Sequence, residues 1–494
     1  MRKVMEKQLK IGQVDIPNIQ IDLNSRDEIP QVLLGLQAIY SDRRVRNEVF
    51  SILHKVVPEN IDSSNGRPGM CLWKILVLGT LRLNCNWDYD KLREIANNHK
   101  NIREFLGHTI NEFDQRYALQ TLKDNISLFA PEVLDQISRV VVKAGHKLVN
   151  HNHEGLTGRC DSFVMETDVH YPTDINLLWD AIRKVIELIG QECEQLGITE
   201  WRQNQHILRK IKKLFNRSRK LKRSNSKDKQ KRAAKKQQIV EAHQEYIGLV
   251  EQYIKRARIS LATLNELAIG NIARIMLIEH FIGHAKRQID QIRRRVVKDE
   301  KILHSEKTFS IFEPQTEWIS KGKAGVPQEL GLKVCIIEDQ YGFILHHHVM
   351  ENQTDDQIAV AMVTKAKQKF SALNRCSFDK GFHSPKNQED LQRLLDNVVL
   401  PRKGKLSLKA KEIEHSEGFI EARRKHSAVE SAINALENHA LDRCPDHGIT
   451  GFKRYVALGV LARNIQILGA RIQQKALRRL MRRKKSENPY RLAV

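Results

Sequence analysis

Three short runs of the sequence decide the fold class: Leu-Lys-Val-Cys-Ile-Ile at residues 332–337, Phe-Ile-Leu-His-His-His-Val at residues 343–349 and Asn-Arg-Cys-Ser-Phe-Asp at residues 374–379. A polar turn with glycine at 339–342 joins the first two, which predicts a hairpin followed by a third strand. Between the second and third strands, Thr354 begins a helix whose apolar residues recur at helical spacing. A helix over 384–395 and a strand at 398–400 complete the pattern. It indicates a mixed sheet in an α+β protein.

The third run ends in a carboxylate, Asp379, directly before Lys380 and Gly381. A strand holds such a residue rigidly, and the turn that follows exposes its oxygens, so the carboxylate is well placed to hold a metal ion. Aspartate and glycine are also common in turns for purely conformational reasons. On this stretch alone both interpretations stay open.

The composition of the 494 residues indicates a polyanionic partner. The net charge of +24 is a surplus that nucleic acid, first, or an anionic membrane surface, second, would neutralise. Seven cysteines are scattered without a Cys-x-x-Cys pair, which argues against a zinc ribbon and suits a reducing cytosol. The N-terminus lacks the apolar core of a signal peptide, and the apolar stretch at 70–83 is too short to span a bilayer. We therefore expect a cytoplasmic protein without a membrane segment.

Helical patterns lie on both sides of one early strand. Residues 30–149 carry apolar stripes at helical spacing and predict an N-terminal helical domain that binds DNA or pairs with a second copy. The run 160–171 is the first clear strand, with Asp161 near its start and Asp168 seven residues later. This odd spacing puts the two carboxylates on opposite faces, so only one of them faces a given site. From 175 to about 298 the pattern is helical again.

A dense basic block lies within this second helical region. Residues 209–236 hold fifteen lysines and arginines against one acid, Asp228. Such a block is typical of a solvated or disordered arm. The helical patterns that flank its serine-containing centre favour instead a helical hairpin that follows a phosphate backbone and releases counterions from it. The DNA contacts expected here are Lys212, Lys213, Arg219, Lys220, Lys222 and Arg223.

More basic residues adjoin the predicted sheet. The loop-rich segment 312–328 contains two lysines but lacks the end of a P-loop, so we interpret it as a loop that contacts DNA. The further DNA contacts expected near the sheet are Lys321, Lys323, Lys380, Arg402, Lys403, Arg423 and Arg424.

The C-terminal part is predicted to be helical. A long helix over 417–441 carries a buried apolar stripe, and Glu430 adjoins it. The segment 446–494 ends in a basic amphipathic helix that lies on DNA or is solvated. The three histidines at 346–348 could form a metal tract, but alternate residues of a strand face opposite sides, which favours ordinary strand histidines.

Together these segments resemble the RNase H-like catalytic core of the bacterial insertion-sequence DDE transposases. The resemblance covers about residues 30–470. The quoted motifs are Asp-Ser-Phe-Val-Met-Glu at 161–166, His-Tyr-Pro-Thr-Asp at 170–174, Phe-Asp-Lys-Gly-Phe at 378–382, Arg-Arg at 423–424 and Val-Glu at 429–430.

The resemblance implies three catalytic and metal-ligating acids: Asp161, Asp379 and Glu430. Asp168 is the rival for the first position. One departure concerns Glu437, which stands seven residues after the glutamate, where related transposases often carry Lys or Arg. The basic residue that holds the DNA end is therefore expected elsewhere, with Arg423 and Arg424 as candidates.

The implied cofactor is Mg²⁺ or Mn²⁺, with two ions in each active site. Carboxylate oxygens suit these hard cations, and three carboxylates can hold two ions about 4 Å apart for an in-line displacement at phosphorus. The implied partners are double-stranded DNA, both the terminal repeats and the target, and a second subunit, because two DNA ends must be paired. The location implied is the bacterial cytoplasm, at the nucleoid when DNA is bound.

The expected organisation follows from these parts: an N-terminal helical domain at 1–150, the first strand of an RNase H-like core at 151–174, a basic helical insertion at 175–310, the remainder of the core at 311–445 and a basic helical tail at 446–494. The expected function is cleavage of DNA at the ends of an insertion sequence and joining of the 3′ ends to target DNA.

Two other classes of function remain open. One is a catalytically inactive DNA-binding protein on the same fold, and the other is a helical RNA-binding protein whose acids are only turn and surface residues. Metal dependence separates the enzyme from both. A preference for duplex DNA ends separates the first two from the third.

Overall fold

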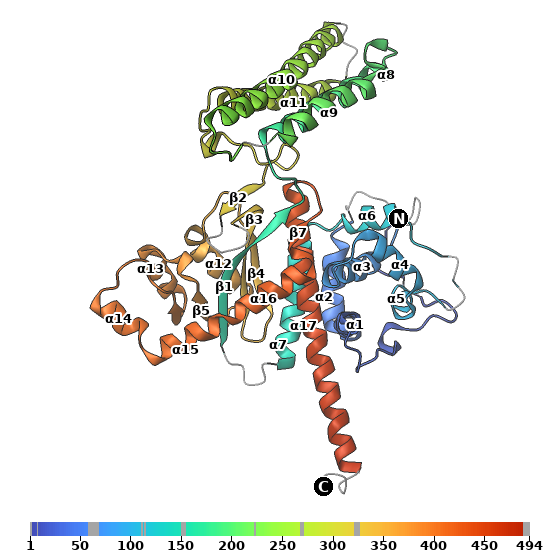
Figure 1. Cartoon of the computed structure of the whole chain (residues 1–494). Coiled ribbons are helices and arrows are strands. Elements are labelled where there is room, and N and C mark those ends of the chain that lie inside the picture. Colours follow the sequence, from blue (N-terminus) through green and yellow to red (C-terminus); the bar gives the residue numbers. More distant parts are fainter. Residues whose placement is uncertain are drawn as a thin grey trace. The chain divides into compact units, whose positions relative to one another are not determined.

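A computed structural model of the chain describes residues 2–6, 8–57, 69–109, 112, 115–149, 155–221, 224–266, 271–320 and 327–487. Within them the protein has the α+β class that the sequence predicts, mostly helical and with one mixed sheet (Figure 1). The chain divides into two compact units: unit 1 comprises Met1–Asp168 and Glu317–Val494, and unit 2 comprises Val169–Thr316. Unit 2 therefore extends a few residues beyond the expected insertion at each end. The N-terminal helices, expected as a separate domain, fall in the same unit as the sheet.

The N-terminal part of unit 1 is helical, as predicted. Aspartates begin several of its helices: Asp42 accepts hydrogen bonds from the amides of Arg44 and Val45, and Asp88 accepts one from that of Lys91. Such caps satisfy amides that the first helical turn leaves without partners. The helices are α1 (Glu28–Ser41), α2 (Arg43–His54), α3 (Leu72–Asn84), α4 (Tyr89–Asn98), α5 (Lys100–Phe105), α6 (Leu119–Ile126) and α7 (Pro131–Val149).

The sheet contains the predicted hairpin and the strands on either side of it. Its strands are β1 (Leu156–Thr167), β2 (Glu317–Ser320), β3 (Gln328–Asp339), β4 (Ile344–Val349), β5 (Leu373–Phe378), β6 (Asn397–Val399) and β7 (Arg443–Cys444). The long strand β1 lies between β3, which is antiparallel to it, and β5, which is parallel to it. β6 extends the parallel side, and β4 pairs with β3 on the antiparallel side. The strand order across the sheet is β2-β3-β1-β5-β6; in addition, β4 pairs with β3, and β7 pairs with the end of β1.

Helices cover both faces of this sheet. On one face α12 (Asp355–Lys369) lies against β3, β4 and β5; Thr354 and Gln357 form the capping box at its start. On the other face are α7, α16 and α17, whose positions relative to the sheet can be followed in Figure 1. The helices after α12 are α13 (Pro385–Leu394), α14 (Leu408–Glu414), α15 (Glu417–His426), α16 (Ala428–Leu436) and α17 (Gly448–Glu487).

Two predictions for this C-terminal part were wrong. The helix expected over 417–441 is divided into α15, α16 and a π-helical segment at Glu437–Leu441, where Ala440 has a positive φ of 71°. The segment 312–328, expected as a loop, contains the edge strand β2, which pairs with the start of β3.

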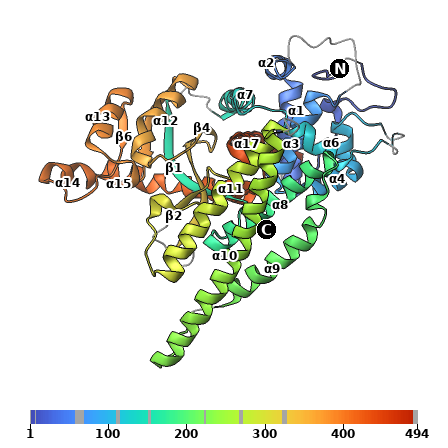
Figure 2. The same cartoon turned by 90° about the horizontal axis from the view of Figure 1, so that it is seen from above.

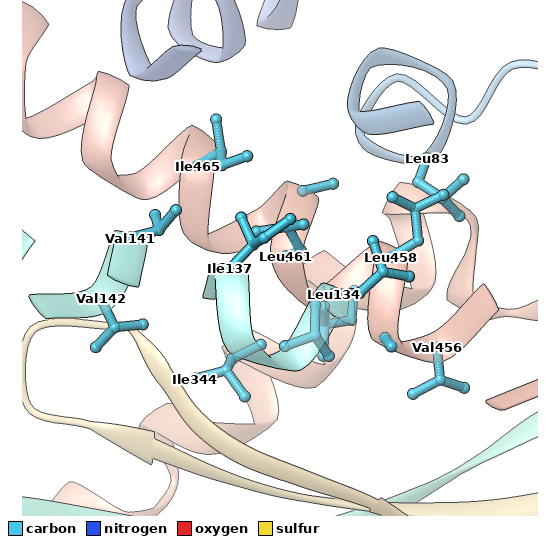
Figure 3. Close-up of a cluster of buried hydrophobic side chains, with 14 of the residues drawn as sticks. Leu83, Leu134, Ile137, Val141, Val142, Ile344, Val456, Leu458, Leu461 and Ile465 are labelled. Carbon is cyan, nitrogen blue, oxygen red and sulfur yellow. The ribbon is translucent and has the colours of Figure 1, made fainter. Parts of the chain in front are cut away.

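Helix α17 is part of the core rather than a basic tail along its whole length. Its residues from Phe452 to Leu468 are largely buried, and it packs against α1, α3 and α7. Figure 3 shows Leu458, Leu461 and Ile465 of α17 among apolar side chains of α3, α7 and β4. Burial of this kind stabilises the fold by roughly 25 cal/mol for each Å² of apolar surface removed from water. Only the last part of the helix has the exposed, basic character that the sequence predicted.

Unit 2 is a helical bundle with a hydrophobic core of its own. Its helices are α8 (Asp174–Gln195), α9 (Asn204–Lys220), α10 (Lys229–Glu266) and α11 (Ile272–Ile292). Helices α9 and α10 run side by side, as Figure 2 also shows, and they form the predicted helical hairpin around the basic block. No helix among the described residues combines the length and the hydrophobicity that a membrane span requires.

Short helical turns complete the two units: 3₁₀ turns at Ile16–Asn18, Thr199–Trp201, His304–Glu306 and Lys380–Phe382, and a π-helical turn at Arg293–Val297.

Candidate active site

The sheet brings the first two predicted acids together. Parallel pairing aligns Cys160 of β1 with Phe378 of β5, so Asp161 and Asp379 follow at the same level on adjacent positions of the sheet. The partly buried Asp161 carboxylate accepts a hydrogen bond of 2.7 Å from its neighbouring amide, that of Ser162. The exposed Asp379 carboxylate accepts one of 3.3 Å from the amide of Gly381 and so caps the turn after β5.

The third predicted acid, Glu430, approaches the same place from a helix. It lies exposed in the first turn of α16, which packs against β1. Burial raises the pKa of Asp161 to about 6 against the effect of the Ser162 amide, and the negative charges of Asp379, Asp355 and Glu430 raise this pKa further. Asp379 and Glu430 therefore both lie close enough to Asp161 to act on its carboxylate.

A fourth carboxylate, that of Asp355, belongs to this group and was missed in the sequence, where it reads only as an acid at a helix start. Its Oδ1 accepts a hydrogen bond of 2.6 Å from the Ser162 hydroxyl, and its Oδ2 lies 2.8 Å from the ammonium of Lys333. A Cβ atom added to Gly381 would lie 3.5 Å from an oxygen of Asp355 and 3.5 Å from one of Asp379. The carboxylates of Asp355 and Asp379 thus flank the same glycine.

His426 connects the helical side of the site to β5. Its Nδ1 lies 2.9 Å from the hydroxyl of Ser377, two residues before Asp379. Burial lowers the pKa of His426, whereas the nearby carboxylates of Asp379 and Glu430 oppose this shift. The imidazole consequently lies between the end of β5 and the first turn of α16. Sequence patterns gave no signal for it, because a single histidine in a helix is unremarkable.

The rival for the first position, Asp168, lies elsewhere. β1 ends at Thr167, and the side chain of Asp168 is 61% exposed and 3.6 Å from the guanidinium of Arg443. Asp161 rather than Asp168 is the acid that the fold brings to Asp379.

The donor set of this carboxylate site fits a hard divalent cation. Carboxylate oxygens are the ligands that Mg²⁺ and Mn²⁺ prefer, and a cation between them would offset both the burial of the Asp161 charge and its repulsion by the neighbouring carboxylates. In the described ranges, however, no three or more His, Cys, Asp or Glu side chains are arranged as a group that could hold a metal ion. Among the described residues, these acids therefore lie near one another but do not form a metal-binding group.

Several predicted DNA contacts lie at the rim of this site. The Lys403 ammonium donates a hydrogen bond of 2.8 Å to the carbonyl oxygen of Gly381, which puts it beside the turn of Asp379. Lys380 is exposed within that turn, and Arg402 is exposed next to Lys403. Arg423 and Arg424 are exposed in the last turn of α15. The predictions for Lys321 and Lys323 fall outside the described residues.

The basic helical hairpin of unit 2 presents a separate set of cations. Lys212, Lys213, Arg219 and Lys220 are exposed on α9, opposite the buried Ile211 and Phe215. The predicted contacts Lys222 and Arg223 lie outside the described residues.

A groove of about 380 Å³ lies between α10 and α11 and was not predicted from the sequence. The basic residues that line it are Lys255, Arg258, Lys286 and Arg293, beside the acids Glu251 and Asp290. Because Arg293 forms an ion pair of 2.8 Å with Glu251, part of the positive charge of this groove is neutralised internally.

The histidines of β4 are strand residues, as favoured above. His346 is buried, its Nδ1 lies 3.1 Å from the ammonium of Lys369, and burial lowers its pKa to about 2. His348 contacts Gln353 at 2.8 Å. In this part of the described chain they do not converge on one point.

The site thus combines Asp161 in the middle of β1, Asp379 directly after β5, and two acids in the first turns of helices, Asp355 in α12 and Glu430 in α16. Lysine side chains lie at its rim. In comparisons with known proteins, no family model, no curated protein and no solved structure matches this chain.

Proposed function

We propose that unit 1 contains an RNase H-like core and that the protein is a DDE transposase, which cleaves DNA at the ends of an insertion sequence and joins the 3′ ends to target DNA. The strand arrangement supports this proposal. On one side of β1 lies β3, which is antiparallel to β1 and forms a hairpin with β4; on the other side β5 and β6 lie parallel to β1. A helical unit separates β1 from the rest of the sheet in sequence, where the helical pattern predicted an insertion.

The observation that carries the proposal is the meeting of Asp161, Asp379 and Glu430. The first and the last of these residues, Asp161 and Glu430, are 269 positions apart in the sequence. In the folded protein the charges of Asp379 and Glu430 nevertheless add to the effect of burial and raise the pKa of Asp161. Mutual repulsion of this kind destabilises a fold, and carboxylates with perturbed pKa values are typical of catalytic sites.

The residues have distinct roles in the proposed reaction. Asp161 and Asp379 would hold divalent cations from the sheet, and Glu430 would complete the set from α16. When bound, Mg²⁺ or Mn²⁺ would supply activation of the attacking oxygen and charge stabilisation at the phosphate. Lys403, beside Gly381, would hold a phosphate of the DNA close to Asp379.

Binding of duplex DNA would involve unit 2 as well. The exposed lysines and arginines of α9 would neutralise phosphates, which contributes affinity without sequence preference. Pairing of two DNA ends would require a second subunit, so we expect a homodimer in the complex with DNA.

The proposal is tested with labelled duplex that carries the terminus of the genetic element encoding the protein. The purified protein is incubated with this duplex in Mg²⁺ and in EDTA, beside the variants Asp379→Asn and Asp168→Asn. We expect cuts at the terminus in Mg²⁺ only, lost in Asp379→Asn and retained in Asp168→Asn. Cleavage that survives in Asp379→Asn, or that is lost equally in both variants, would contradict the catalytic assignment.

A second candidate is a catalytically inactive DNA-binding protein on the same fold. It is favoured by one observation: within the described residues the acids do not form a group that could hold a metal ion. DNA binding that depends on salt, without any metal-dependent cut, would support this candidate.

A further inference from the structure

Lys333 is the lysine that the structure brings to the carboxylate site and that sequence patterns did not single out. It lies on β3, opposite Val164 of β1, and its side chain is 28% exposed. Its ammonium lies 2.8 Å from Oδ2 of Asp355. This pairing orients the ammonium towards the start of α12, where the four carboxylates gather.

A short series of contacts connects Lys333 to the proposed catalytic acids. Oδ2 of Asp355, the atom that holds the Lys333 ammonium, lies 3.5 Å from the position that a Cβ of Gly381 would occupy. Oδ2 of Asp379 lies at the same distance from that position. The ammonium of Lys333 is thus one carboxylate away from the turn that presents Asp379.

Asp355 differs from the other acids in that both of its oxygens already have partners. Oδ1 accepts from the hydroxyl of Ser162, and Oδ2 faces the ammonium of Lys333. A carboxylate with both oxygens engaged is a poor free ligand but a suitable counter-ion. An incoming phosphate carries charged oxygens of the same kind and competes with Asp355 for the ammonium.

We propose that Lys333 contacts a phosphate of the bound DNA next to Asp379, and that Asp355 is the counter-ion that holds its ammonium in place until DNA binds. This inference rests on the proposed function, because it assigns the DNA-holding cation of the same site. It supplies from β3 the basic residue that the sequence lacks at Glu437.

Substitution of Lys333 and substitution of Asp355 should change the affinity for DNA in opposite directions, because a phosphate replaces Asp355 as the partner of the ammonium. Loss of Lys333 removes a phosphate contact and one released counterion. Loss of the Asp355 charge frees the ammonium from its competitor, so DNA binds more tightly. The salt dependence separates a direct contact from a general charge effect, because loss of one neutralised phosphate changes the slope of log K against log[salt] by about one.

The test measures duplex DNA affinity by fluorescence anisotropy over a series of salt concentrations, in EDTA so that no cleavage occurs. For Lys333→Met we expect affinity to fall roughly tenfold and the slope of log K against log[salt] to decrease in magnitude by about one. For Asp355→Asn we expect tighter binding with an unchanged slope. Lys333→Arg, which keeps the charge, serves as the matched control and should retain the slope of the unaltered protein. Thermal unfolding of each variant shows whether it is folded.

The outcomes separate this inference from the proposed function. If the unaltered protein cleaves DNA but Lys333→Met keeps its affinity and slope, or if Asp355→Asn weakens binding as Lys333→Met does, Lys333 is not the phosphate contact. If the unaltered protein binds without any metal-dependent cut while the slope of Lys333→Met still changes, the contact stands and the transposase assignment fails. Absence of DNA binding by the unaltered protein overturns both.

Discussion

Gly35 of α1 and Gly469 of α17 lie in direct contact. A Cβ on Gly469 would lie 2.8 Å from the backbone nitrogen of Gly35 and would overlap the carbonyl oxygen of Gln31. A Cβ on Gly35 would in turn overlap the carbonyl oxygen of Ile465. Two helices from opposite ends of the sequence therefore cross at backbone contact, and glycine is required because any side chain would separate them.

Replacement of either glycine by alanine should destabilise unit 1. We expect Gly35→Ala and Gly469→Ala each to lower the free energy of unfolding by at least about 2 kcal/mol, because the added methyl group meets backbone that cannot move aside. Denaturant unfolding followed by circular dichroism measures the change. The control is Gly418→Ala in α15, where a Cβ would meet no atom within 4 Å; helix propensity there predicts a small gain, up to about 1 kcal/mol. Equal effects at all three positions would contradict the crossing.

Removal of the Asp161 charge should stabilise the protein in a pH-dependent way. The pKa of Asp161 is raised to about 6 in the folded protein, mainly by burial, and is close to 4 in an unfolded chain. Between these two pKa values the folded state binds more protons than the unfolded state. The free energy of unfolding therefore decreases as pH rises through this window. In EDTA, Asp161→Asn should therefore raise the free energy of unfolding by roughly 2–3 kcal/mol above pH 7 and by little near pH 4.

Asp168→Asn is the matched control for this pH series. Its carboxylate is mostly exposed and faces only Arg443, and exposed pairs contribute about 0–1 kcal/mol. Its unfolding curves should follow those of the unaltered protein at every pH. A pH-independent change in Asp161→Asn would show that the gain has another cause.

Binding of Mn²⁺ should distinguish the acids of the site from one another. We expect Asp161→Asn and Asp379→Asn each to weaken Mn²⁺ binding at least tenfold, because each removes a charged oxygen ligand. Asp355→Asn should change it much less, since both oxygens of Asp355 are engaged by Ser162 and Lys333. Electron paramagnetic resonance of free Mn²⁺ measures the affinities. Strong loss in Asp355→Asn would place this residue among the ligands.

The basic face of α9 should contribute to DNA affinity in a salt-dependent way. Charge reversal of two exposed residues, Lys213→Glu together with Lys220→Glu, should reduce the affinity for duplex DNA of any sequence and decrease the magnitude of the salt slope by about two. The control is Lys91→Glu, an exposed position of α4 in unit 1. If Lys91→Glu lowered the salt slope as much as the double variant does, the cause would be a general charge effect and not a contact by α9.

The sequence predicted the sheet well where local signals agree with the final structure. The hairpin of β3 and β4, the capped start of α12 and the strand that ends before Asp379 all depend on neighbouring residues, and all are confirmed. β2 was missed because Glu-Trp-Ile-Ser is only four residues long and gains its strand structure from pairing with β3. The burial of the first half of α17 was likewise not predicted, because the basic residues near the end of this helix suggested an exposed tail.

The site shows the same division between local and distant information. Asp161, Asp379 and Glu430 were predicted from motifs, and the fold brings them together. Asp355 and Lys333 were missed because their significance comes from partners far along the chain: Ser162 for Asp355, and the surroundings of Asp379 for Lys333. A helix-start acid and a strand lysine carry no such information in isolation.

In the sequence, unit 2 lies between β1 and the strands that pair with β1, and this order has a consequence for synthesis on the ribosome. At a synthesis rate of about 5–20 residues per second, β3 is made roughly 7–30 s after β1, because about 150 residues lie between them in the sequence. During that time unit 2 can form its own core from local helices, whereas β1 has both edges unpaired. Unit 1 is completed later still, when α17 emerges and meets α1. The twelve residues of β1 are therefore present in the nascent chain for seconds before the strands that pair with them are made.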